Sequence, residues 1–189
     1  EGILQSHSLS VSGGTKKTKY FLSGNYFDQQ GIIKSSSNKR ISSRMNIVTE
    51  VKPWLKAGVN MNITNTTTNL IGSSGDGAGG NGGSVIRYAF FRTPAIPVYN
   101  VNGEYTDKPD RFDLFGDGYS PVGMLAYNNN KRITNRLFGK FFIELSPFKN
   151  FKFTSNLGID FTSANQRRFD RNWGSVGRIN NPNQLSVTD

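Results

Sequence analysis

The stretch LKAGVNMNIT, residues 55–64, alternates apolar and polar side chains with a period of two. The apolar row consists of Leu55, Ala57, Val59, Met61 and Ile63. The intervening positions hold only lysine, glycine, asparagine or threonine. Because successive side chains of a strand point to opposite faces, the stretch predicts a strand with one apolar and one polar face. Its length, about ten residues, also suits a tilted strand that crosses a bilayer.

Composition narrows the class of protein. The 189 residues fit one domain or a piece of a larger protein. Hydrophobic residues make up 35% of the chain, and no apolar run approaches the length of a membrane helix, which leaves barrel strands as the remaining way to span a membrane. The absence of cysteine excludes disulfides, thiolate metal sites and cysteine nucleophiles. The charge of +10 is scattered rather than clustered, so we expect no nucleic-acid partner.

The same alternation recurs along the chain and predicts six strands. We place them at residues 6–13, 18–28, 39–50, 55–65, 132–145 and 151–162. The connections alternate in length: short at 13–17, 51–54 and 146–150, long at 29–38 and 66–131, with a C-terminal loop at 163–189. Tight turns on one side and long loops on the other are typical of outer-membrane barrels. The predicted strands are also longer than the five or six residues usual in soluble sheets.

In the interiors of these strands, charged residues fall on one face only. The polar rows hold Lys19, Arg40, Arg44, Glu50, Lys56, Arg132, Arg136, Lys140, Glu144, Lys152 and Asp160, whereas the apolar rows of the same strand interiors hold none. An Arg or Lys facing lipid costs about 2–4 kcal/mol at the bilayer midplane, which favours this segregation. We therefore predict lipid contact for Leu55, Val59, Met61, Ile63, Leu157 and Ile159. We predict lumen-facing positions for Arg44, Lys56, Arg136 and Lys140.

The fold class predicted is all-β: an antiparallel meander forming part of a large transmembrane barrel with long extracellular loops. Six strands cannot close a barrel wide enough for so many polar side chains, so the rest of the wall must come from elsewhere. The alternative is a soluble β-sandwich module that binds carbohydrate, because a sandwich core excludes charge as well. Dependence on detergent separates the two.

A few sequence features are weak candidates for a metal, catalytic or phosphate-binding site. Asp107, Asp110, Asp113 and Asp117 recur in an aromatic-rich loop and could hold Ca²⁺ or sugar hydroxyls, but their spacing departs from the EF-hand pattern. We expect a solvated loop face there. The single histidine, His7, has no nearby partners for catalysis, and the glycine-rich stretch 72–83 lacks the Lys-Ser/Thr ending of a phosphate-binding loop. We expect no catalytic residue, no metal and no cofactor.

Residues 7–36, HSLSVSGGTKKTKYFLSGNYFDQQGIIKSS, resemble a hairpin of the SusC/RagA-type TonB-dependent outer-membrane transporters. The resemblance continues through residues 39–62, KRISSRMNIVTEVKPWLKAGVNMN, and through RTPAIPVYN at 92–100 with the Asn-Gly turn that follows. RLFGKFFIELSPFKNFKFTSNLGIDF, residues 136–161, resembles the next hairpin. Together these pieces cover nearly all of residues 5–165.

The resemblance implies a 22-stranded barrel around an N-terminal plug, in the outer membrane of a Gram-negative bacterium. It implies import of oligosaccharides or peptides, driven by TonB, with a SusD-like surface lipoprotein as a lid. This chain contains no plug, no TonB box and no coupling signature, so it can supply only wall and loops. A related barrel that serves as a scaffold in a surface complex is a further possibility.

Two roles follow from the resemblance. Arg92, Tyr99, Tyr105 and Asp113 are candidates for contact with the substrate or the lid, although Arg92 and the tyrosines could equally pack the loop onto the barrel. The lumen cations could favour anionic solutes or pair with carboxylates of the plug. We favour pairing, because charges removed from water need partners.

Overall fold

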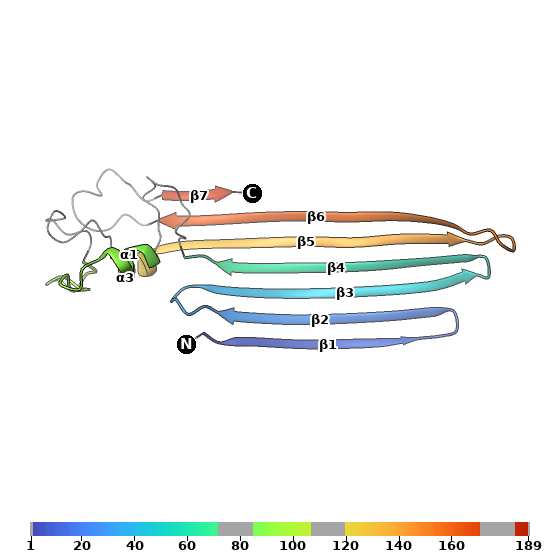
Figure 1. Ribbon diagram of the computed structural model, residues 1–189, viewed down its shortest axis with the longest axis horizontal. Coiled ribbons are helices and arrows are strands. Elements are labelled where there is room, and N and C mark those ends of the chain that lie inside the picture. Colours follow the sequence, from blue (N-terminus) through green and yellow to red (C-terminus); the bar gives the residue numbers. More distant parts are fainter. Residues whose placement is uncertain (1, 72–84, 107–119, 171–183, 189) are drawn as a thin grey trace. The chain divides into compact units, whose positions relative to one another are not determined.

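The computed structural model describes residues 2–71, 85–106, 120–170 and 184–188, and places its strands in one seven-stranded sheet. Each strand lies beside its neighbours in the chain, in the order β1 to β7 (Figure 1). The strands are β1 (Leu4–Gly14), β2 (Thr18–Gln30), β3 (Ser37–Lys52), β4 (Leu55–Asn69), β5 (Asn128–Leu145), β6 (Phe153–Asp170) and β7 (Gln184–Thr188). The predicted all-β antiparallel meander is confirmed.

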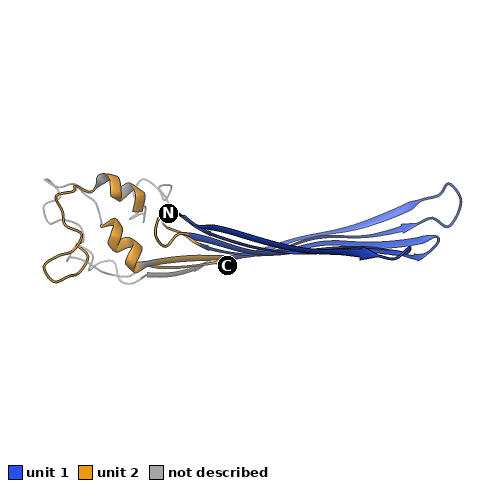
Figure 2. Ribbon diagram, turned by 90° about the horizontal axis from the view of Figure 1, so that it is seen from below, with its two compact units in different colours: residues 1–30, 37–68, 133–164 blue, residues 31–36, 69–132, 165–189 orange. Residues whose placement is uncertain are grey.

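The chain forms two compact units, coloured separately in Figure 2. Unit 1 comprises residues 1–30, 37–68 and 133–164, which are most of the six long strands and their short connections. Unit 2 comprises residues 31–36, 69–132 and 165–189, which are the long connections, the adjoining strand ends and two short helices. The helices are α1 (Val85–Phe91) and α3 (Pro121–Tyr127). Neither is long and apolar enough to cross a membrane, and the same holds for every helix among the described residues.

The register of unit 1 merges the apolar rows of neighbouring strands into one face. Val11 lies opposite Leu22, which lies opposite Met45 on the next strand. His7, Tyr26 and Ile41 form a second such series, and the rings of His7 and Tyr26 stack with centroids 6.4 Å apart. Directly opposed residues of an antiparallel pair share a face of the sheet. The period of two seen in the sequence therefore produces a continuous apolar surface.

Unit 1 is a single layer among the described residues. The only buried hydrophobic side chains described anywhere are Val85 and Met124, and both belong to unit 2. In the apolar rows, Leu9 is 80% exposed and Leu157 is 64% exposed. A β-sandwich would bury such rows against a second sheet. The described part of unit 1 provides no second sheet, which argues against the soluble sandwich.

The element boundaries differ from those expected. Strands β1 to β5 each extend beyond at least one predicted end, and β6 begins at Phe153 rather than at the predicted residue 151. The helices α1 and α3 lie within the segment 66–131 that we expected to be loop throughout. The loop predicted at 163–189 was wrong for two stretches: β6 continues to Asp170, and β7 occupies Gln184–Thr188. Residues 163–170 are polar on both faces, apart from Ala164 and Phe169, so a period of two leaves no visible signal there.

Candidate functional site

A small hairpin carries two of the residues singled out from the sequence. Tyr99 and Tyr105 face each other across an isolated antiparallel bridge, and the Thr106 amide donates to the Val98 carbonyl at 2.9 Å. Asn100 shapes the turn: its side-chain Oδ1 accepts hydrogen bonds from the Asn102 and Glu104 amides, both at 2.9 Å. Gly103 adopts a φ of +79°, which favours glycine. The Asn-Gly pair noted in the sequence therefore builds the turn that brings the tyrosines together.

Three aromatic rings, Tyr99, Tyr105 and Tyr127, form what we call the tyrosine cluster. The Tyr99 and Tyr105 rings lie 5.0 Å apart in a tilted arrangement. Tyr127, the last residue of α3, meets Tyr105 edge-on with centroids 5.5 Å apart. Such pairs add about 0.5–1.5 kcal/mol beyond their buried area. Tyr127 was not predicted, because its approach to Tyr105 depends on the helix α3, which we did not predict from the sequence.

The tyrosine cluster also changes the acidity of one phenol. A side-chain hydrogen bond with Tyr99 raises the pKa of Tyr105 above its ordinary value, and repulsion from the neighbouring Tyr99 and Tyr127 hydroxyls in their ionised form adds to the rise. The phenol of Tyr105 is therefore protonated throughout the physiological range, as a hydrogen-bond donor or acceptor rather than a charge.

Arg92 braces the base of the hairpin. Its guanidinium Nη2 donates to the Thr106 carbonyl at 3.1 Å, next to Tyr105, and its amide donates to the Tyr88 carbonyl of α1 at 2.9 Å. The side chain is half-buried. Both of these contacts of Arg92 lie within unit 2.

The two helices contact each other, and α3 carries Tyr127 of the tyrosine cluster. Ser120 begins α3: its side-chain Oγ accepts from the Gly123 amide at 3.2 Å, and Pro121 follows at the first helical position. Met124 of α3 and Val85 of α1 are 4% and 7% exposed and supply the buried apolar contacts of unit 2. Helices of two turns need such tertiary support to form.

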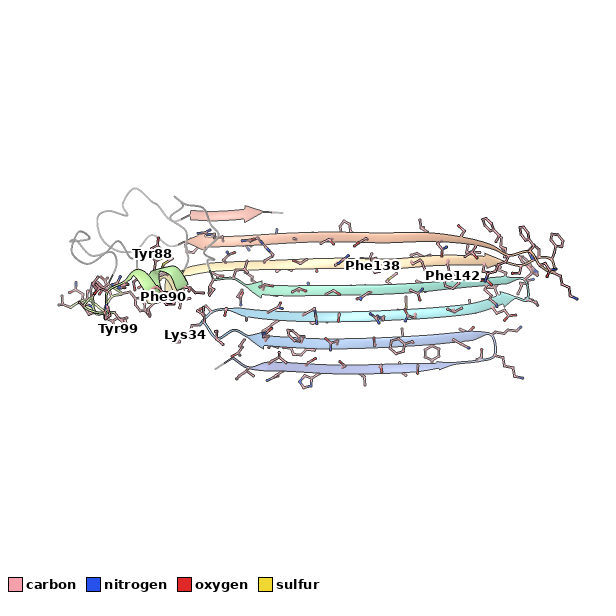
Figure 3. All side chains as sticks on the ribbon, in the orientation of Figure 1. Lys34, Tyr88, Phe90, Tyr99, Phe138 and Phe142 are labelled. Atoms are coloured by element: carbon pink, nitrogen blue, oxygen red, sulfur yellow. The ribbon has the colours of Figure 1, made fainter. Side chains whose placement is uncertain are left out.

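The predicted contact residues are thus partly brought together. Arg92, Tyr99 and Tyr105 belong to one cluster of unit 2, with Tyr99 55% exposed and Val101 at the hairpin tip fully exposed. Figure 3 labels Tyr99 in unit 2, together with Tyr88 and Phe90 of α1. Asp113, together with Asp107, Asp110 and Asp117, lies outside the described residues. Within the described ranges, no three His, Asp or Glu side chains gather as metal ligands would.

The polar face of unit 1 carries ion pairs and cation–aromatic contacts. Arg136 of β5 and Asp160 of β6 form a bidentate ion pair, in which Nε and Nη2 donate to Oδ1 and Oδ2 at 3.1 and 2.8 Å. The Lys152 ammonium pairs with the Glu144 carboxylate at 2.6 Å. Lys140 lies over the Phe142 ring at 5.9 Å. Phe138 and Phe142 both appear along β5 in Figure 3. The four predicted lumen residues, Arg44, Lys56, Arg136 and Lys140, are all exposed in this single layer.

Gly58 makes room for one of these aromatic rings. A Cβ built on Gly58 would overlap with the Phe142 ring, and it would lie 3.0 Å from the Ile47 carbonyl oxygen. The ring therefore rests on the bare backbone of β4, where any side chain would displace it. Gly58 thus accommodates Phe142 in a row of β5 that also holds Arg136, Lys140 and Glu144.

The residues predicted to face lipid lie on the opposite surface. Ile63, Leu157 and Ile159 are 52%, 64% and 38% exposed, and Leu55, Val59 and Met61 are half-buried. Apolar side chains with this exposure need a cover that unit 1 does not itself provide among its described residues.

Comparison with known proteins supports the same conclusion. No protein-family profile matches the chain. TonB-dependent receptor P26 of Formosa agariphila is 30% identical over 165 residues, which cover 85% of this chain and 15% of the receptor. TonB-dependent receptor P3 of the same bacterium is 26% identical over 165 residues, covering 87% of this chain and 16% of that receptor. This chain is similar, over most of its length, to a segment of the TonB-dependent receptors.

Solved structures confirm the fold of the TonB-dependent receptor segment. The RagAB peptide transporter matches with a TM-score of 0.64 at 20% identity, covering 88% of this chain and 18% of that one. The RagAB peptide importer in its closed-closed state matches equally well, at 21% identity. The resemblance to the SusC/RagA type is thereby confirmed. The segment spans less than a fifth of the length of the relatives and structures described here.

Proposed function

We propose that this segment forms wall and extracellular loops of a TonB-dependent outer-membrane importer of oligosaccharides or peptides, which works with a SusD-like surface lipoprotein. In this proposal the segment has no enzymatic role. Outer loops and the lipoprotein hold the ligand, and rearrangement of a plug elsewhere in the protein admits it to the lumen. The cations Arg44 and Lys56 on the polar face pair with carboxylates of that plug.

The main support is the single-layer sheet whose strand interiors carry charges on one face only, in a chain that matches TonB-dependent receptors over most of its length. The polar face already holds ion pairs of its own, as expected for a surface wetted by a polar interior. The names of the RagAB structures, peptide transporter and peptide importer, describe those proteins and favour peptides as one substrate class.

The test is uptake by the complete protein in cells with and without TonB. We expect labelled oligopeptides or oligosaccharides to enter only when TonB is present. Absence of uptake with every substrate, while the barrel is folded in the membrane, would favour the scaffold role instead. Uptake that persists without TonB would contradict the TonB-driven mechanism.

Within this proposal, the tyrosine cluster contacts the ligand or the lid. Tyr99 and Val101 support this, because they expose aromatic and apolar surface on a hairpin held rigid by Asn100 and Arg92. Tyrosine offers a flat apolar ring and a hydroxyl at little cost in conformational entropy, which suits sugars and peptides alike.

Replacement of Tyr99 by alanine should weaken binding of the ligand or the lipoprotein by roughly fivefold to a hundredfold, the range for removal of a contacting aromatic residue. Phe90→Ala is the matched control, because Phe90 is an equally prominent aromatic residue, 86% exposed, on α1. Equal losses for both variants would argue against a specific role for the cluster.

A further inference from the structure

The three short connections of unit 1 lie next to one another at one end of the strands. The Glu50 amide at the end of β3 donates to the Lys17 carbonyl of the β1–β2 turn at 2.7 Å. The Ser146 amide at the end of β5 donates to the Trp54 carbonyl of the β3–β4 turn at 2.8 Å. These bonds join neighbouring hairpins, so the side chains of the three connections form one continuous rim.

This rim is basic. Lys16 and Lys17 lie in the first connection, Lys52 borders the second, and Lys149 lies in the third, and all four are exposed. We call these four residues the basic rim. Residues 15–17, 52–54 and 146–152 contain no aspartate or glutamate. The one further lysine in these stretches, Lys152, is paired with Glu144 and is not counted in the rim.

An aromatic band, Phe148, Phe151 and Phe153, lies beside the basic rim. These rings are 75%, 53% and 50% exposed. Phe153, the first residue of β6, continues the alternation of Leu157 and Ile159 and so belongs to the apolar row of that strand, and Phe151 lies two residues before it in the connection. Phenylalanine has no polar group to hydrate, so rings exposed to this extent favour an apolar cover.

From the middle of the sheet to the turns, the exposed side chains therefore change from aliphatic to aromatic and then to cationic. A phospholipid leaflet has the complementary order, with acyl chains, an interfacial zone that favours aromatic rings, and phosphate groups that attract lysine. In an outer-membrane barrel the short turns lie on the periplasmic side. An acidic protein partner would match the lysines but would leave the aliphatic-to-aromatic gradient along the strand unexplained.

We propose that the basic rim and the aromatic band form a binding site for anionic glycerophospholipid of the periplasmic leaflet, in which the ammonium groups of Lys16, Lys17, Lys52 and Lys149 bind headgroup phosphates. The site rests on the barrel setting of the proposed function but does not depend on import. Each lysine near an anionic membrane surface contributes roughly fivefold in affinity.

The test measures lipid binding to the complete detergent-solubilised protein by native mass spectrometry, with phosphatidylglycerol and with phosphatidylcholine. The test variant carries Lys16→Gln, Lys52→Gln and Lys149→Gln, one change in each connection. The control carries Lys34→Gln, Lys131→Gln and Arg167→Gln, which removes the same charge from exposed positions of unit 2. We expect the wild type and the control to prefer phosphatidylglycerol, and the test variant to lose up to about a hundredfold in affinity for it.

Equal affinity of the test variant and the wild type would overturn the proposal, as would an equal loss in the control, because the effect would then follow net charge alone. The proposal is supported if the wild type and the control bind phosphatidylglycerol more tightly than phosphatidylcholine, whereas the test variant shows no such preference. The resistance of the folded barrel to denaturation by detergent on gels verifies that each variant folds. Uptake measured in the same variants separates the two proposals. If the protein imports substrate but does not discriminate between the lipids, the lipid site alone is refuted. If it binds the anionic lipid but shows no uptake, import alone is refuted.

Discussion

At the scale of single residues, Gly58 has the most constrained environment. Addition of a methyl group there should force the Phe142 ring from its seat and crowd the Ile47 carbonyl, which lies 3.0 Å from the Cβ position. We expect Gly58→Ala to reduce the free energy of unfolding by about 1–3 kcal/mol, the usual cost of overpacking. Equilibrium unfolding of the complete protein in urea measures it.

Gly158→Ala is the matched control for that change. Gly158 has the same even-numbered, polar-face position in its strand, but a Cβ there would meet nothing within 4 Å. Its substitution should be neutral or stabilise slightly, because alanine restricts the unfolded chain. If Gly58→Ala in a Phe142→Ala background still costs as much as in the wild type, the ring is not the cause.

The phenol of Tyr105 allows a prediction about pH. Its pKa is raised in the folded loop, so folding favours the protonated form. The stabilisation from its hydrogen bond with Tyr99 is fully present below the ordinary tyrosine pKa of about 10 and is lost as the pH rises through the raised value. We expect Tyr99→Phe to lower the pKa of Tyr105 toward the ordinary value. The pKa is measured by titrating the phenolate absorbance with and without Tyr105→Phe, because the difference between the two curves belongs to Tyr105. An unchanged titration would show that another neighbour causes the shift.

At the scale of secondary-structure elements, the two faces of β4 should respond oppositely to charge. Val59 and Asn60 are adjacent near the middle of the strand, on the apolar and polar rows respectively. Val59→Arg should cost about 2–4 kcal/mol in a bilayer if that row faces lipid. Asn60→Arg should stay within about 0.5 kcal/mol, as for an ordinary surface change. Reversible unfolding from vesicles compares the two variants, and equal costs would contradict the assignment of faces.

The sequence predicted elements well where one face is apolar, and poorly elsewhere. The row Leu55 to Ile63 located β4 at its first residue, but its polar end through Asn69 carries no contrast between faces. The helix α3 did have a signal, Ser120 followed by Pro121, which is a preferred helix start. α1 is only seven residues long and depends on burial of Val85, which no local pattern reveals.

In the candidate site, too, local sequence signals predicted some residues, whereas long-range contacts could not be predicted. The Asn-Gly turn and the proline-containing stretch around Arg92 pointed to an ordered loop, and the structure joins Arg92, Tyr99 and Tyr105 there. Tyr127 enters from twenty-two residues beyond Tyr105, through α3, so its contact is a long-range consequence of packing. The contacts of Arg92 with Thr106 likewise require the hairpin to be formed first.

At the scale of the whole molecule, the described residues leave the apolar face of the sheet uncovered and the outer edge of β1 unpaired. Every residue of β1 is exposed, and β1 is the outermost strand of the sheet. A strand edge of eleven residues beside an apolar face is a template for association with other chains. In a closed barrel the missing strands would pair this edge and lipid would cover the face.

We therefore expect the isolated segment of 189 residues to aggregate in buffer without detergent, and the complete protein to be monodisperse only in detergent or lipid. Size-exclusion chromatography with light scattering, in plain buffer and in detergent, measures both, and far-ultraviolet circular dichroism follows the sheet content. The single-layer architecture requires this behaviour, because Leu9, Ile63 and Leu157 would otherwise contact water over half or more of their surface. A monodisperse, sheet-rich segment in plain buffer would mean that these rows find cover within the chain itself, and the barrel assignment would then fail together with the lipid site.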